Sequence, residues 1–104
     1  MFGFFKDKEL EDFAGSLADE MSERVPPKAI DTERAANPKF QSTVARAVEN
    51  LLVGAQRYCR DRNPGVLKKA RLSKSFQDRM IGLGYPRHFA KEITMALAKH
   101  LTQI

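Results

Sequence analysis

Residues 37–60 carry the most regular apolar pattern in the chain, and this pattern constrains the fold more than any other feature. Its apolar residues are Phe40, Val44, Ala47, Val48, Leu51, Leu52, Ala55, Tyr58 and Cys59. A spacing of three and four places them on one side of an α-helix, whereas a strand would alternate every two residues. The apolar face is too wide to be left in water, so we expect the other elements to cover it.

Both ends of this helix are marked in the sequence. Asn37 can accept a hydrogen bond from a free N–H of the first turn, and Pro38 needs no N–H at that position. Residues 63–65, which read Asn-Pro-Gly, cannot continue a helix without cost. We therefore predict a long central helix over residues 37–61.

Further amphipathic segments lie on either side and predict an all-α fold. Residues 6–24 form the first, and the small residues Ala14, Gly15 and Ala18 in it would let another helix come close. Two prolines end that helix, so residues 25–36 are predicted to be a connector. Residues 1–5 are an apolar N-terminal tail.

The C-terminal half predicts shorter helices. Residues 66–72 suggest a short helical turn or two, and Ser73 or Ser75 would cap a separate helix that Gly84 ends. The last helix would begin at Pro86 and run to about Thr102. The sequence thus predicts a compact bundle of four to five helices around the central one, in a single helical domain over residues 1–104.

Composition places the domain in the cytoplasm. The single cysteine, Cys59, excludes an internal disulfide and fits a reducing compartment. No stretch approaches the roughly 20 apolar residues of a membrane span, and Met1-Phe2-Gly3-Phe4-Phe5 is followed at once by charged residues. We expect a soluble protein without a membrane partner.

Charge is divided unevenly along the chain. The net charge is +5, but residues 1–50 hold ten acidic and seven basic side chains, and residues 51–104 hold three acidic and eleven basic ones. Two interpretations follow: a basic surface for a polyanion, or two halves that neutralise one another within the fold or between protomers.

Catalytic and ligand-binding motifs are not found in the sequence. The two histidines, His88 and His100, are twelve residues apart and do not form a pair on a helix, and the single cysteine forms no zinc motif. Gly82-Leu83-Gly84 lacks the lysine of a phosphate loop. We predict no enzyme activity, no cofactor and no metal.

The segment 79–97 fits a general helix-turn-helix pattern, with Gly84 in the turn and Ile93 facing inward. The turn Leu83-Gly84-Tyr85-Pro86-Arg87, with Ala90 following, also resembles the first loop of ubiquitin-associated domains. That resemblance covers eight residues and implies a protein-recognition loop. We interpret both as local turn geometry, since a Gly-aromatic-Pro corner joins helices in many unrelated proteins.

Two functional hypotheses remain. The first is a protein-interaction or assembly module, with a protein partner or self-association through Phe2, Phe4 and Phe5. These three phenylalanines could instead fold back on the first helix of their own chain. The alternative is a nucleic-acid-binding accessory protein that uses the basic C-terminal half. Its candidate polyanion contacts are Arg57, Arg60, Arg62, Lys68, Lys69, Arg71, Lys74, Arg87 and Lys91.

Overall fold

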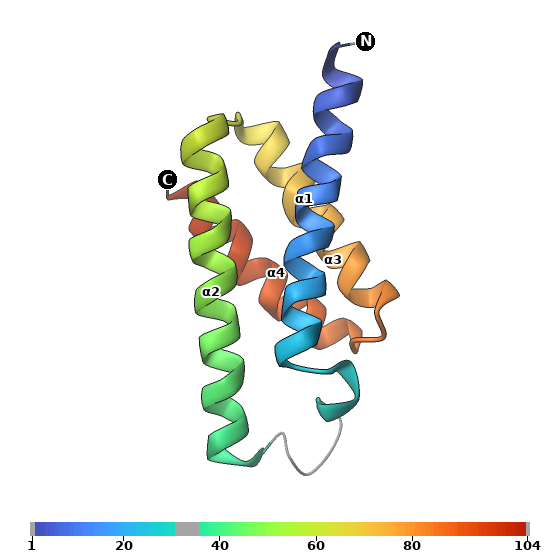
Figure 1. Cartoon of the computed structure of the whole chain (residues 1–104), viewed down its shortest axis with the longest axis vertical. Helices are drawn as coiled ribbons and strands as arrows, with labels where there is room; N and C mark the ends of the chain where they lie inside the picture. The colour runs from blue at the N-terminus through green and yellow to red at the C-terminus, as the bar shows by residue number, and fades with distance from the viewer. Residues whose placement is uncertain (1, 31–35, 104) are drawn as a thin grey trace.

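The structure, a computed structural model, describes residues 2–30 and 36–103, with side chains described from Lys8 onward. Four α-helices account for most of it: α1 (Phe2–Arg24), α2 (Pro38–Arg62), α3 (Val66–Gly82) and α4 (Arg87–Thr102). One short 3₁₀ turn, η1 (Pro27–Ala29), follows α1, and the described residues include no strand. The predicted all-α bundle is confirmed (Figure 1).

The four helices pack in a closed cycle. α1 contacts α3 and α2, and α4 contacts the same two helices from the other side. Figure 1 shows α1 and α2 upright and α4 crossing the bundle obliquely. The largest side chains that are fully buried between them are Leu10, Met21, Val25, Leu72, Phe76, Met80, Leu97 and Leu101. All four helices therefore bury apolar side chains in one continuous core.

The ends of α2 are those that the sequence predicts. The Asn37 side chain accepts a hydrogen bond from the Lys39 N–H at 2.8 Å, and Pro38 occupies the first helical position. At the other end Asn63 adopts a left-handed conformation with φ of 49°, which asparagine tolerates better than most residues. The predicted apolar face of α2 is also confirmed, because Ala47, Leu51, Ala55 and Cys59 are all buried.

Two predicted helix boundaries were wrong. The first helix begins at Phe2 and not at Lys6. Residues 66–82 form one continuous helix, without a break at Ser73 or Ser75. The Ser73 hydroxyl donates to the carbonyl oxygen of Lys69, one turn back, at 3.2 Å. A serine that bonds the preceding turn in this way fits inside a helix, so it need not act as a cap.

Close helix approach also occurs at a different glycine from the one predicted. Ala14 and Ala18 are fully buried, but a methyl group added at Gly15 would meet no atom within 4 Å. At Gly54 of α2 the same methyl group would lie 3.4 Å from Leu17 Cδ2. The two alanines therefore admit the neighbouring helix, and Gly54 brings α2 close to α1.

The turn between α3 and α4 is fixed by hydrogen bonds and by a buried tyrosine. Tyr85 N–H donates to Met80 O at 3.2 Å and Gly84 N–H to Ile81 O at 3.0 Å. Gly84 has φ of 105°, so these bonds form a Schellman motif with glycine at the left-handed position. The Tyr85 hydroxyl donates to the carbonyl oxygen of Val25, beyond the end of α1. This turn holds the α3–α4 corner against the rest of the bundle.

Candidate protein-interaction surface

A hollow lies where α2 turns into α3. Its volume is about 550 Å³, and it is lined by Glu9 and Leu10 of α1, Tyr58 and Arg62 of α2, and residues 63–68. We call it the corner hollow. A volume of this order is large enough to hold apolar side chains of a partner.

Aromatic and charged side chains make one wall of the corner hollow rigid. The ring of Tyr58 stacks on Phe13 of α1, with centroids 4.0 Å apart and planes within 10°. The guanidinium of Arg62 lies 5.8 Å from the centroid of the Tyr58 ring and forms an ion pair with Glu9. α1 and α2 are thus fixed to one another at this point, and the wall does not depend on a ligand.

The opposite wall exposes two large aliphatic side chains. Val66 and Leu67 are 81% and 86% exposed and begin α3, immediately after the extended Gly65. Both are in the first turn of α3, before the helix reaches the core at Leu72. Their exposure is the highest of any large apolar residue with a described side chain. Adjacent exposed aliphatic residues beside an apolar hollow are typical of an interaction site.

The N-terminal candidate residues lie at the same end of the molecule. Phe2, Phe4 and Phe5 belong to the first turns of α1, which extend beyond the corner where α2 turns into α3 (Figure 1). Their side chains lie outside the described residues, so the structure does not test the predicted contacts of these phenylalanines.

The predicted polyanion contacts fall into separate places. Arg57, Arg60 and Arg62 are exposed near the end of α2, and Lys68 lines the corner hollow. Lys69, Arg71 and Lys74 follow along α3, and Arg87 and Lys91 are exposed at the start of α4.

The length of α4 separates the cations near the end of α2 from those at the start of α4. His100, near the end of α4, lies 3.3 Å from Gln56 of α2. Arg87 precedes His100 by thirteen residues, which corresponds to about 20 Å along a helix. The cations of α2 and those at the start of α4 are therefore at opposite ends of α4 and are not brought together.

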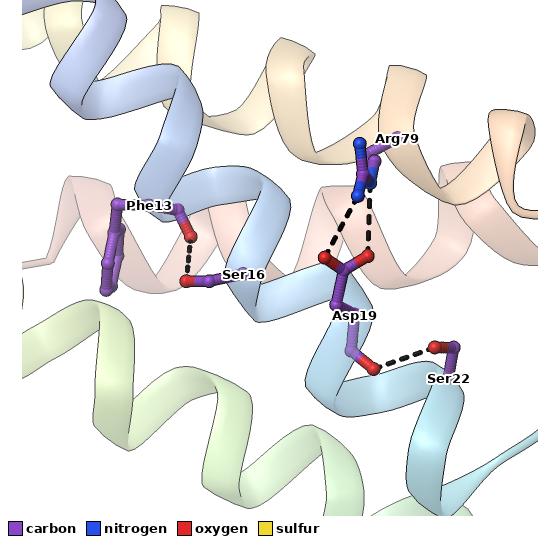
Figure 2. Close-up of polar contacts among 5 residues, drawn as sticks. All are labelled: Phe13, Ser16, Asp19, Ser22 and Arg79. Atoms are coloured by element: carbon purple, nitrogen blue, oxygen red, sulfur yellow. Dashed lines mark hydrogen bonds and ion pairs between the residues drawn. The ribbon is translucent and has the colours of Figure 1, made fainter.

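Several of the basic residues have acidic partners within the chain. Arg62 pairs with Glu9, and Lys74 pairs with Asp78 at 3.4 Å. Arg79, another cation of the basic half, donates two hydrogen bonds to Asp19 of α1, at 3.1 and 3.0 Å (Figure 2). Asp19 raises the pKa of Arg79 through these bonds and through its negative charge. Two of these pairs join the acidic first helix to the basic half.

Burial also shifts the pKa of three other groups. It raises the pKa of the Cys59 thiol, although Lys69 acts in the opposite direction. It raises the pKa of Tyr58, with Glu9 adding to the effect and Arg62 opposing it. It raises the pKa of Tyr85 to about 12. All three groups are therefore protonated at neutral pH, and a protonated thiol is a poor nucleophile.

Histidines and carboxylates show no clustered arrangement in the part of the chain that the structure describes. His88 is exposed at the start of α4, and the partly buried His100 contacts Gln56. The side chains described, those of residues 8–30 and 36–103, include no group of three or more suited to hold a metal ion. The described helices include none that is long and apolar enough to cross a membrane.

The sequence did not point to the corner hollow. Val66 and Leu67 were expected in a short helical turn, and Tyr58 was expected to face the core. Their position depends on the direction in which the chain leaves the Asn-Pro-Gly turn, which the residue pattern does not specify. The available signal was two adjacent aliphatic residues directly after a helix-ending turn.

The structure defines the chain as an all-α four-helix bundle with an apolar hollow at one corner. Comparisons with protein-family models, with curated proteins and with solved structures find no match for this chain.

Proposed function

We propose that this chain is a non-catalytic protein-interaction or assembly module, and that the corner hollow receives apolar side chains of a partner protein. One observation carries the proposal: Val66 and Leu67 are almost fully exposed beside an apolar hollow of about 550 Å³. Transferring such aliphatic side chains out of water on binding gains about 1.5–3 kcal/mol each. The stacked Tyr58 and Phe13 supply a preformed wall, which lowers the entropic cost of binding.

The arrangement of charge supports a protein partner over a polyanion. Glu9 and Asp19 of α1 neutralise Arg62 and Arg79 of the basic half, so part of the charge asymmetry is used within the fold. The cations of α2 and α4 are far apart along α4. Nucleic-acid binding remains the second candidate, supported by the exposed Arg57 and Arg60 at the end of α2.

The buried cysteine supports a cytoplasmic location for the module. Cys59 is a free thiol within the core. Such a residue needs no oxidising compartment and fits a reducing one.

Photo-crosslinking in the cells that express the protein tests the proposal. A benzophenone amino acid in place of Leu67 should form covalent adducts with a polypeptide, identified by mass spectrometry. The same probe in place of Val53, an exposed residue of α2, is the matched control. Adding Val66→Asp should remove the adducts at position 67, because a carboxylate is costly to bury in an apolar contact. Adducts no more frequent at position 67 than at position 53 would contradict the proposal.

A further inference from the structure

The first helix extends beyond the bundle that it belongs to. Glu9 pairs with Arg62, the last residue of α2, and both line the corner hollow, so the end of α2 lies near Glu9 of α1. Phe2 precedes Glu9 by seven residues, which adds about 10 Å of helix beyond the end of α2. Figure 1 shows the first turns of α1 standing clear of the corner between α2 and α3.

The sequence of this extension is not in register with the core. The buried positions Leu10, Ala14, Leu17 and Met21 lie on one side of α1. Successive helix residues are rotated by about 100°, so the same side of α1 continues towards the N-terminus at residues 3, 6 and 7. These residues are Gly, Lys and Asp. Phe2 falls within about 20° of the side of Phe13, which faces α2, but it lies beyond the end of α2. Phe4 and Phe5 occupy other positions. The helix register therefore assigns them no place against the chain's own core.

Two helical turns without a neighbouring element are marginally stable in water, and phenylalanines make such a segment a candidate for burial elsewhere. The corner hollow lies at the base of this segment and exposes apolar side chains of its own. Resting on the function proposed above, we propose that the corner hollow receives the first two turns of α1 from a second copy of this chain, and that the two copies form a two-fold symmetric dimer.

The length of the α1 extension is consistent with this two-fold arrangement. Two copies that approach end to end place their α1 extensions side by side and antiparallel. Each extension is about 10 Å long, so its tip reaches the level of Glu9 and Leu10 of the other copy. These two residues form one side of the corner hollow. The same contact is made twice, which is the self-complementary interface that a two-fold axis requires.

The apolar area of the contact and the charge of residues 6–9 are also consistent with a dimer. Three phenylalanines bury about 450–750 Å² per copy. With Val66 and Leu67 added, the total approaches the roughly 800 Å² per partner of a standard interface. The side chains of residues 6–9 are Lys, Asp, Lys and Glu, whose charges cancel. Residues 6–9 therefore add no net charge to the contact, although each copy carries a net charge of +5.

Sedimentation velocity on the full-length chain tests the dimer. The wild-type protein should show a dimer that dissociates on dilution. The anchor variant, with Phe2→Ser, Phe4→Ser and Phe5→Ser, removes the inserted side chains. The hollow variant, Leu67→Glu, places a carboxylate at a site that is 86% exposed in the single chain, so folding is unaffected. Each should raise the dissociation constant at least about 100-fold. Val53→Glu is the control and should remain dimeric.

Mixing the two variants distinguishes this geometry from other dimers. The anchor variant retains an intact hollow, and the hollow variant retains intact phenylalanines. One of the two symmetric contacts can therefore form between them, and a fluorescently labelled mixture should give a heterodimer that neither variant alone gives as a homodimer. Two monomeric variants that do not associate on mixing would overturn the reciprocal contact. A dimer that survives Leu67→Glu would overturn the site.

Failure of this inference is separable from failure of the proposed function. A wild-type chain that is monomeric at submillimolar concentration, while position 67 still crosslinks to a different protein, overturns the second-copy assignment alone. A monomer without protein adducts at position 67 overturns both. A monomer that sediments with phosphatidylcholine vesicles also overturns the assignment, since a lipid surface then takes the phenylalanines.

Discussion

At the scale of single residues, Tyr85 links two segments that are far apart in the sequence. Its ring is buried and stacks near Phe89, with centroids 5.5 Å apart. Its hydroxyl donates to the carbonyl oxygen of Val25, which follows α1. The α3–α4 turn and the end of α1 are thus held together by one side chain that is apolar along its length and polar at its tip.

We predict that Tyr85→Phe destabilises the fold by about 1–2 kcal/mol, because the variant keeps the ring but removes the donor to a buried carbonyl. Urea unfolding at neutral pH measures the loss. Thr102→Ala is a suitable control, since its hydroxyl bonds the carbonyl oxygen of Lys99 on an exposed surface. A Tyr85→Phe variant as stable as the wild type would contradict the role of this hydroxyl.

The same residue predicts a dependence on alkaline pH. Burial raises the pKa of Tyr85 from 10.0 to about 12. The folded state therefore favours the protonated phenol, and its contribution is complete below pH 10 and is lost as the pH rises towards 12. The stability difference between the wild type and Tyr85→Phe should shrink over this interval. Measuring both proteins at each pH cancels the titration of the lysines.

At the scale of elements, the glycines of the chain differ in what surrounds them. Gly15 is inside α1 and has open space where a side chain would begin. Gly84 ends α3 with φ of 105°, a conformation that residues with a side chain rarely adopt. The same substitution should therefore have opposite effects at the two positions.

We predict that Gly15→Ala stabilises the protein by about 0.5–1 kcal/mol through its higher helix propensity. Gly84→Ala should destabilise it by at least about 1 kcal/mol, because alanine is strained at this φ. Thermal and urea unfolding of both variants checks the signs. A loss of stability in Gly15→Ala would show that the neighbouring helix is closer to residue 15 than the structure has it.

Helices were predictable from the sequence where the apolar period and the caps agree. Residues 37–61 met both conditions, and α2 has the predicted cap at Asn37 and the predicted end before Asn63. Residues 66–82 have apolar residues at helical spacing but conflicting caps, because two serines offered an apparent start within the helix. Their hydroxyl groups can satisfy either a free helix end or the preceding turn. Only the packing of Leu72 and Phe76 in the core decides which of these two roles the serines take.

At the scale of the whole molecule, the candidate site depends on how separate helices meet. The corner hollow combines residues 9 and 10 with residues 58–68, and the Glu9–Arg62 ion pair joins them. The sequence indicated Phe2, Phe4 and Phe5 as contact residues because three phenylalanines close together need burial. It could not place Val66 and Leu67 beside Glu9 and Leu10, since the angle between α2 and α3 is a property of the assembled bundle.

The division of charge between the two halves gives a last prediction. Asp19 and Arg79 are sixty residues apart and form a two-bond pair on the surface between α1 and α3. Both side chains are about half exposed, at 45% and 52%, so water and salt weaken their attraction. The pair should therefore orient the two helices more than it stabilises them.

We predict that Arg79→Glu lowers the melting temperature, by less than Gly84→Ala does, because it places a second carboxylate opposite Asp19. The double variant Asp19→Arg with Arg79→Glu should recover most of the loss, since it restores an opposite pair with the same net charge as the wild type. At 1 M salt, where the Debye length is about 3 Å, the difference between single and double variants should become small. A loss unchanged by salt would mean that Arg79 acts through packing of its aliphatic chain on α1 and not through its charge.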